Sequence, residues 1–102
     1  MAKQYYTTSN FKSAIIALDN VLIDFPSFNN REEVHFLIVK SSYLLAINSI
    51  KSKVTERLKA TLEAYAHFKD NYPQSTYLLE LENTYNQTQK MLNNLKNITN
   101  EI

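Results

Sequence analysis

The side chains best suited to catalysis or metal binding are His35 and His67, the only two histidines in the chain. Neither belongs to an H-E-x-x-H motif, and no acidic cluster lies beside either of them in the sequence. A zinc site would need additional ligands, and an acid–base mechanism would need a partner within hydrogen-bond reach. We therefore interpret both as histidines on a helix surface or in a groove. The sequence predicts no catalytic residue, no metal site and no cofactor, so we do not expect an enzyme.

Two short polar runs could also suggest chemistry. Glu32 and Glu33 are paired carboxylates, but adjacent residues on a helix point about 100° apart, whereas glycosidase carboxylates face one another across a bond. Helix capping and interaction with the helix dipole explain them better. Ser41 and Ser42 could line a groove, but no histidine lies at helical spacing to activate either hydroxyl. We favour close helix packing, with each hydroxyl bonded to the carbonyl four residues earlier.

The composition removes several classes of function. The 102 residues contain no glycine, which phosphate-cradling loops and dinucleotide-binding turns require where the backbone approaches a phosphate. They contain no cysteine, which excludes disulfides, thiolate zinc sites and a cysteine nucleophile. Eleven basic and ten acidic residues give a net charge of +1, without the concentrated basic face of a nucleic-acid-binding protein. No apolar run approaches the ~20 residues of a membrane span, and the first residues lack the hydrophobic core of a signal peptide.

Apolar residues recur at steps of three and four along most of the chain, which indicates amphipathic helices. Thr8–Asn10 could cap a helix, Pro26 and Pro73 would each stop one, and Lys51–Lys53 forms a short polar break. The segment after Asn30 is apolar nearly all round, so we expect it at the centre of the fold. We predict about five helices, over residues 2–8, 10–25, 30–51, 54–72 and 75–98.

The helices repeat with an offset of 47 residues, which is the separation of Pro26 and Pro73. At this offset the apolar positions coincide: Phe11 with Leu58, Ile15 with Leu62, Leu18 with Tyr65, Val21 with Phe68 and Phe25 with Tyr72. A repeating helix pair is typical of an α-solenoid, because one pair cannot bury its apolar face alone. The sequence therefore predicts an all-α fold of antiparallel helix pairs, stacked as a short tetratricopeptide-like α-solenoid.

Ala14 lies twelve residues before Pro26, which is the spacing of the small residue and the terminal proline in tetratricopeptide repeats. Those repeats take about 34 residues, so the surplus is expected between Lys51 and Glu56. One family contains such an over-long variant. The segments FKSAIIALDNVLIDFP, NNREEVHFLIVKSSYLLAINS and ERLKATLEAYAHFKDNYPQSTYLLELE, taken in order, resemble BamD-type outer-membrane assembly lipoproteins. The resemblance extends from about Tyr5 to Leu92 and is to the C-terminal part of such proteins.

The resemblance implies a role in surface binding without catalysis. BamD-type proteins are held at the periplasmic face of the bacterial outer membrane by a lipidated N-terminal cysteine. They bind the periplasmic domains of the barrel-inserting channel protein and its accessory lipoproteins. Residues 1–102 would then be one domain, a fragment of a longer repeat array without the lipid anchor and the N-terminal repeats. No nucleic-acid partner is expected. Core residues exposed at the cut N-terminal edge would favour a homodimer through that edge.

Charged residues near the helix ends are our candidates for partner contacts. Such contacts at the rim of an interface mainly tune the association rate and the orientation of the partner. The alternative interpretation is that these side chains make no partner contact and only keep the protein soluble. A second class of function stays open, namely a generic tetratricopeptide adaptor that binds peptides or another protein and has no role in barrel assembly. The candidate partner-binding residues are Arg31, Glu32, Lys51, Lys53 and Arg57.

Overall fold

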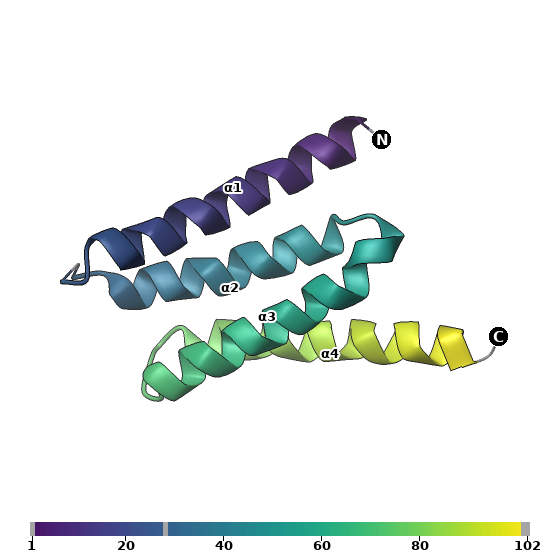
Figure 1. Ribbon diagram of the computed structural model, residues 1–102. Helices are drawn as coiled ribbons and strands as arrows, with labels where there is room; N and C mark the ends of the chain where they lie inside the picture. The colour runs from purple at the N-terminus through teal and green to yellow at the C-terminus, as the bar shows by residue number, and fades with distance from the viewer. Residues whose placement is uncertain (1, 28, 101–102) are drawn as a thin grey trace.

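The computed structural model describes the backbone of residues 2–27 and 29–100 and the side chains of residues 8–27 and 29–97. The described backbone forms four α-helices and no strand, so the predicted all-α class is confirmed. The helices are α1 (Ala2–Asp24), α2 (Arg31–Ile47), α3 (Lys51–Asn71) and α4 (Leu78–Asn100). Each of the first three runs antiparallel to the next in the chain, as Figure 1 shows.

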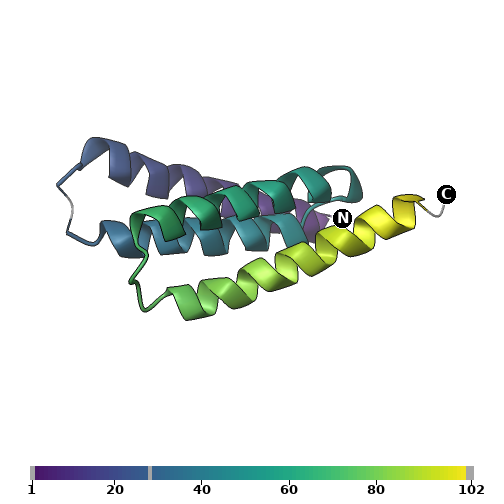
Figure 2. The same ribbon diagram turned by 90° about the horizontal axis from the view of Figure 1, so that it is seen from below.

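Helix α2 occupies the centre of the molecule. It packs against α1 on one side and against α3 and α4 on the other, while α4 also packs along α3. In the described part of the chain α1 packs against α2 alone, and Figure 1 shows it as the outermost helix at one edge. Figure 2 shows α4 extending past the ends of α2 and α3 towards the C-terminus. The predicted central position of the most apolar helix is therefore confirmed.

The prediction of about five helices is wrong, because α1 runs from Ala2 to Asp24 without a break. Thr8–Asn10 lie inside this helix and do not cap a new one. Inside a helix, a serine, threonine or asparagine costs at most about 0.7 kcal/mol relative to alanine. In addition, neither proline nor glycine interrupts α1. The predicted polar break at Lys51–Lys53 is also helical, since it forms the first turn of α3. The link between α2 and α3 is the shorter segment Asn48–Ile50.

Both aromatic-proline pairs stop a helix. Helix α1 ends at Asp24, two residues before Pro26, and α3 ends at Asn71, two residues before Pro73. The residue that precedes a proline is pushed out of the helical region, which explains both ends. No described residue has a positive φ, so the turns in this part of the chain need no glycine.

The hydrophobic core lies between α2, α3 and α4. Its buried centre is formed by Val39, Tyr65, Phe68 and Leu81. Two pairs of stacked aromatic rings pack at this core. The ring centroids of Phe36 and Tyr77 lie 4.2 Å apart, and those of Tyr65 and Tyr85 lie 4.7 Å apart. By contrast, no described side chain of α1 is buried. Helix α1 therefore lies against the surface of a unit whose core is made by the other three helices.

Candidate interaction surface

Arg31 begins α2 and binds the end of α1. Its Nη1 donates to the carbonyl oxygen of Leu22 at 3.1 Å, with the carbonyl oxygens of Phe25 and Pro26 at 3.5 and 3.4 Å. The last carbonyls of a helix have no partner within the helix, and a cation there also interacts favourably with the helix dipole. This predicted partner-binding residue therefore closes the turn between α1 and α2.

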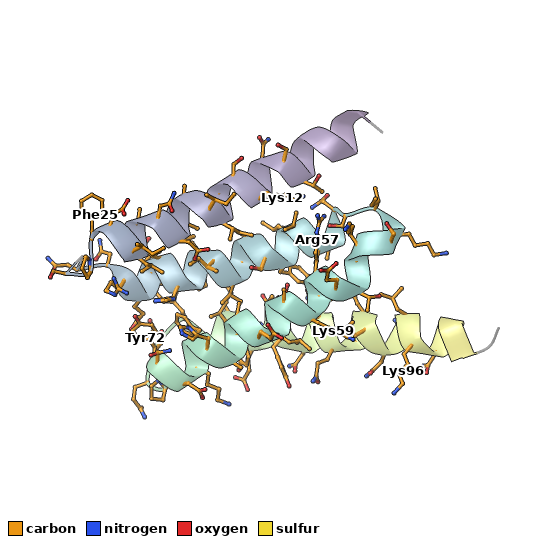
Figure 3. The ribbon with its side chains drawn as sticks, viewed as in Figure 1. Lys12, Phe25, Arg57, Lys59, Tyr72 and Lys96 are labelled. Atoms are coloured by element: carbon orange, nitrogen blue, oxygen red, sulfur yellow. The ribbon has the colours of Figure 1, made fainter. Side chains whose placement is uncertain are left out.

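Glu32 and Arg57 also make contacts within the chain. A carboxylate oxygen of Glu32 accepts a hydrogen bond from Ser75 Oγ at 3.2 Å, which joins the start of α2 to the turn before α4. Arg57 Nη1 donates to Ser49 Oγ at 2.6 Å, and that hydroxyl in turn donates to the carbonyl of Leu45. Arg57 lies between α2 and α3 near their connecting turn, as Figure 3 shows.

Lys51 and Lys53 differ from the other three predicted residues. Both side chains are exposed on the first turn of α3, which carries no acidic residue. A cation near a helix N-terminus is unfavourable by roughly 0.3–1 kcal/mol, because the dipole there is positive. The structure thus divides the five predicted residues: Arg31, Glu32 and Arg57 join helices to one another, and the two lysines face solvent.

The two histidines, which the sequence places on separate helices, come together in the structure. The rings of His35 on α2 and His67 on α3 lie 5.3 Å apart between centroids, and Tyr72 lies 5.7 Å from His35. Burial, followed by the nearby His67 and Arg31, lowers the pKa of His35, and Asp19 opposes the shift. No group of three or more histidine, aspartate or glutamate side chains suited to a metal ion occurs among the residues described.

The predicted packing role of Ser41 and Ser42 needs correction. Neither hydroxyl makes a hydrogen bond within the described chain. Both residues are half-buried, so water can satisfy their hydroxyls. Bonding to the carbonyl four residues earlier occurs instead at fully buried threonines, with Thr61 bonded to Arg57 at 3.0 Å and Thr88 to Thr84 at 2.7 Å.

An apolar surface on the outer side of α1 escaped the sequence analysis. Ile16 is 61% exposed, Ile23 is 73% exposed and Phe25 is 61% exposed. Ile16 and Ile23 are seven residues apart, so they share one face of the helix. The 47-residue offset could have revealed them, because it pairs Ile16 with Glu63 and Ile23 with Asp70. We call Ile16, Ile23 and Phe25 the α1 patch.

A shallow groove also lies between α3 and α4, with a volume of about 320 Å³. The residues that line this groove include the aromatic Tyr65 and Tyr85 and the charged Lys69, Asp70 and Glu82. Burial, together with the nearby Glu82, raises the pKa of the Tyr65 hydroxyl. The groove therefore presents both aromatic surface and charge of either sign.

Comparison with known proteins gives one match. A family model described as "YfiO: Outer membrane lipoprotein" matches residues 1–99. Searches of curated proteins and of solved structures found no match. No helix in the part of the chain that the structure describes has the length and apolar character needed to cross a bilayer.

Proposed function

Because the chain belongs to the YfiO family of outer membrane lipoproteins, we propose that it is a non-catalytic scaffold that binds other proteins during β-barrel assembly. Family membership supplies the coarse role, which is that of an outer-membrane assembly lipoprotein. The structural observation that carries the proposal is the α1 patch, since exposed apolar area is typical of protein interaction sites and these three side chains are 61–73% exposed.

The finer proposal concerns partners and place. The chain corresponds to C-terminal repeats of a longer α-solenoid array, a single domain that works at the periplasmic face of the outer membrane. These repeats dock on the periplasmic domains of the barrel-inserting channel protein and its accessory lipoproteins. Stacking in an array is supported by the arrangement of α1, whose described residues pack on α2 alone and leave the α1 patch uncovered. A homodimer through the same edge would cover that patch in an isolated chain.

Lys51 and Lys53 are the charged residues that we assign to partner docking. Their exposed side chains make no hydrogen bond or ion pair with the described residues, and they lie where the dipole of α3 disfavours a cation. Arg31, Glu32 and Arg57 act indirectly, by fixing the turns between helices. An acidic partner surface would satisfy the two lysines, and rim charges of this kind act mainly on the association rate.

A charge reversal tests this assignment. We expect Lys51→Glu with Lys53→Glu to slow association with the channel protein's periplasmic domains by roughly tenfold at low salt. The matched control is Lys90→Glu with Lys96→Glu, which changes the same charge at exposed positions on α4. Surface plasmon resonance at two salt concentrations gives both rates. Equal effects of the two double variants would remove the lysines from the docking site.

The groove between α3 and α4 supports a second candidate function, a generic adaptor that binds peptides without a role in barrel assembly. The aromatic and charged side chains that line the groove could hold one side chain of an extended peptide. Cross-linking of the full-length protein in cells, followed by identification of its partners, separates the two candidates. Recovery of barrel-assembly components supports the scaffold, and recovery of unrelated proteins alone supports the adaptor.

A further inference from the structure

The C-terminal end of α3 meets the first turns of α2 in a corner that contains both histidines of the chain. The His35 and His67 rings are tilted by 43° at 5.3 Å, and Tyr72 connects His35 to Phe68 through ring contacts of 5.7 and 5.1 Å. The side-chain amide of Asn71 donates to the backbone carbonyl of His67 at 2.8 Å and lies 3.3 Å from its Nε2. We call His35, His67 and Tyr72 the histidine corner.

The charges around the corner come from three helices. Arg31 precedes His35 by one turn of α2, His67 belongs to α3, and Asp19 of α1 acts on His35 from the other side. Arg31 is held in place because it binds the carbonyls that end α1. With both imidazoles charged, three cations would share this corner with one carboxylate. Like charges at such separations repel, and the repulsion is stronger where the ring is partly removed from water.

We propose that His35 and His67 make the packing of α3 on α2 sensitive to acid, so that the corner is closed when both imidazoles are neutral and loosens when they become charged. Histidine is the side chain whose charge ordinarily changes between pH 5 and 8. The chain has no other histidine and no cysteine. The corner is thus a pH-sensitive contact between α2 and α3.

The direction of the effect follows from thermodynamic linkage. Burial, His67 and Arg31 lower the pKa of His35 in the folded protein below its ordinary 6.5. Between the folded pKa and 6.5 the unfolded chain therefore binds more protons than the folded chain. Stability rises with pH across this window, and it is lost as the pH falls from 6.5 through the folded pKa of His35.

The experiment measures melting temperature by circular dichroism between pH 7.5 and pH 5.5, a range above the titration of ordinary carboxylates. We expect the wild-type midpoint to fall by about 3–6 °C, because about 1 kcal/mol shifts the midpoint of a domain this size by about 4–8 °C. His67→Gln should reduce the fall, and the double variant His35→Gln with His67→Gln should nearly remove it. His67→Lys, which keeps a cation at every pH, should lower the midpoint already at pH 7.5 relative to His67→Gln.

The titration of His35 provides an independent readout. Its ring resonances in NMR should give a midpoint below 6.5 in the wild type, and the midpoint should move upward in His67→Gln and downward in His67→Lys. A double variant that melts with the same pH dependence as the wild type would overturn the proposal. So would a His35 midpoint at or above 6.5 that does not respond to the residue at position 67. His67 is exposed, so its single variants are expected to fold.

Discussion

Helices α1 and α3 occupy equivalent places in the repeat, yet they are used differently. Each is followed by an aromatic residue and then a proline, and Figure 3 shows the two aromatic residues, Phe25 and Tyr72, at the same end of the molecule. Helix α3 packs against both α2 and α4, whereas the described residues of α1 pack against α2 alone. Tyr72 is half-buried against His35, and its counterpart Phe25 is 61% exposed.

The outer faces of these two helices differ in the same way. Helix α3 carries exposed acids, Glu63 and Asp70, at the positions where α1 carries exposed isoleucines. Acids at these positions keep a helix face in water, and isoleucines there leave apolar area for a neighbour to cover. The same repeat pattern therefore specifies the helix and its inner face in both repeats. The polarity of the outer face differs between the repeats and depends on what that face contacts.

The largest expected effect is at the inner positions. Phe68 is 1% exposed, so Phe68→Ala should reduce the free energy of unfolding by about 3–5 kcal/mol. Its counterpart Val21 is half-buried, and Val21→Ala should cost about 1 kcal/mol. Urea unfolding followed by circular dichroism compares the two. If Phe68→Ala does not fold, Phe68→Leu replaces it, with a smaller loss that should still exceed that of Val21→Ala. Equal losses at the two positions would show that α1 is as integral to the core as α3.

An intermediate loss of stability is expected on replacing the two arginines that bind the turns before and after α2. Arg57 bonds to the hydroxyl of Ser49, which is 7% exposed, so Arg57→Ala should lower the free energy of unfolding by about 1–2 kcal/mol. Arg31 binds the part-buried carbonyl of Leu22 and the exposed carbonyls of the residues that follow α1, and Arg31→Ala should cost about 0.5–1 kcal/mol. Chemical denaturation of both variants tests the order. A larger loss for Arg31→Ala would mean that the α1–α2 turn is the more important of the two.

The smallest effect on stability is expected at the α1 patch. Ile16→Glu with Ile23→Asp gives α1 the residues of α3, and stability should change by no more than about 0.5 kcal/mol per site. Association should change much more: we expect the wild-type chain to self-associate in analytical ultracentrifugation and the double variant to stay monomeric. As a control, Glu63→Gln with Asp70→Asn alters the equivalent face of α3 without adding apolar area. Persistent association of the Ile16/Ile23 variant would place the contact elsewhere.

Much of the fold follows from spacing in the sequence. The steps of three and four and the two prolines are local signals, so they give the helical class and the ends of α1 and α3. The break expected at Thr8–Asn10 failed because residues that favour a helix start are also tolerated inside a helix. Whether such a residue caps depends on the backbone before it, which the side-chain types alone do not reveal.

The candidate site was harder to predict. Exposure of Lys51 and Lys53 follows from their polarity and their position near a helix start. The contacts of Arg31, Glu32 and Arg57 depend on which turns lie beside them, and this is decided by packing between helices. His35 and His67 lie far apart in the sequence on the consecutive helices α2 and α3, so their contact at 5.3 Å appears only after α3 folds back on α2. The α1 patch was overlooked because its residues resemble core residues in composition.

The arginine contacts at the turns also bear on the speed of folding. Arg31 reaches carbonyls five to nine residues away, and Arg57 reaches a hydroxyl eight residues away. Among the residues that the structure describes, neighbouring helices pack on one another, and the contact between α2 and α4 is the one that skips a helix. Chains dominated by such local contacts fold in microseconds to milliseconds. The α1–α2 and α2–α3 hairpins can thus form soon after their second helix is available, with each turn closed by an arginine of the hairpin itself.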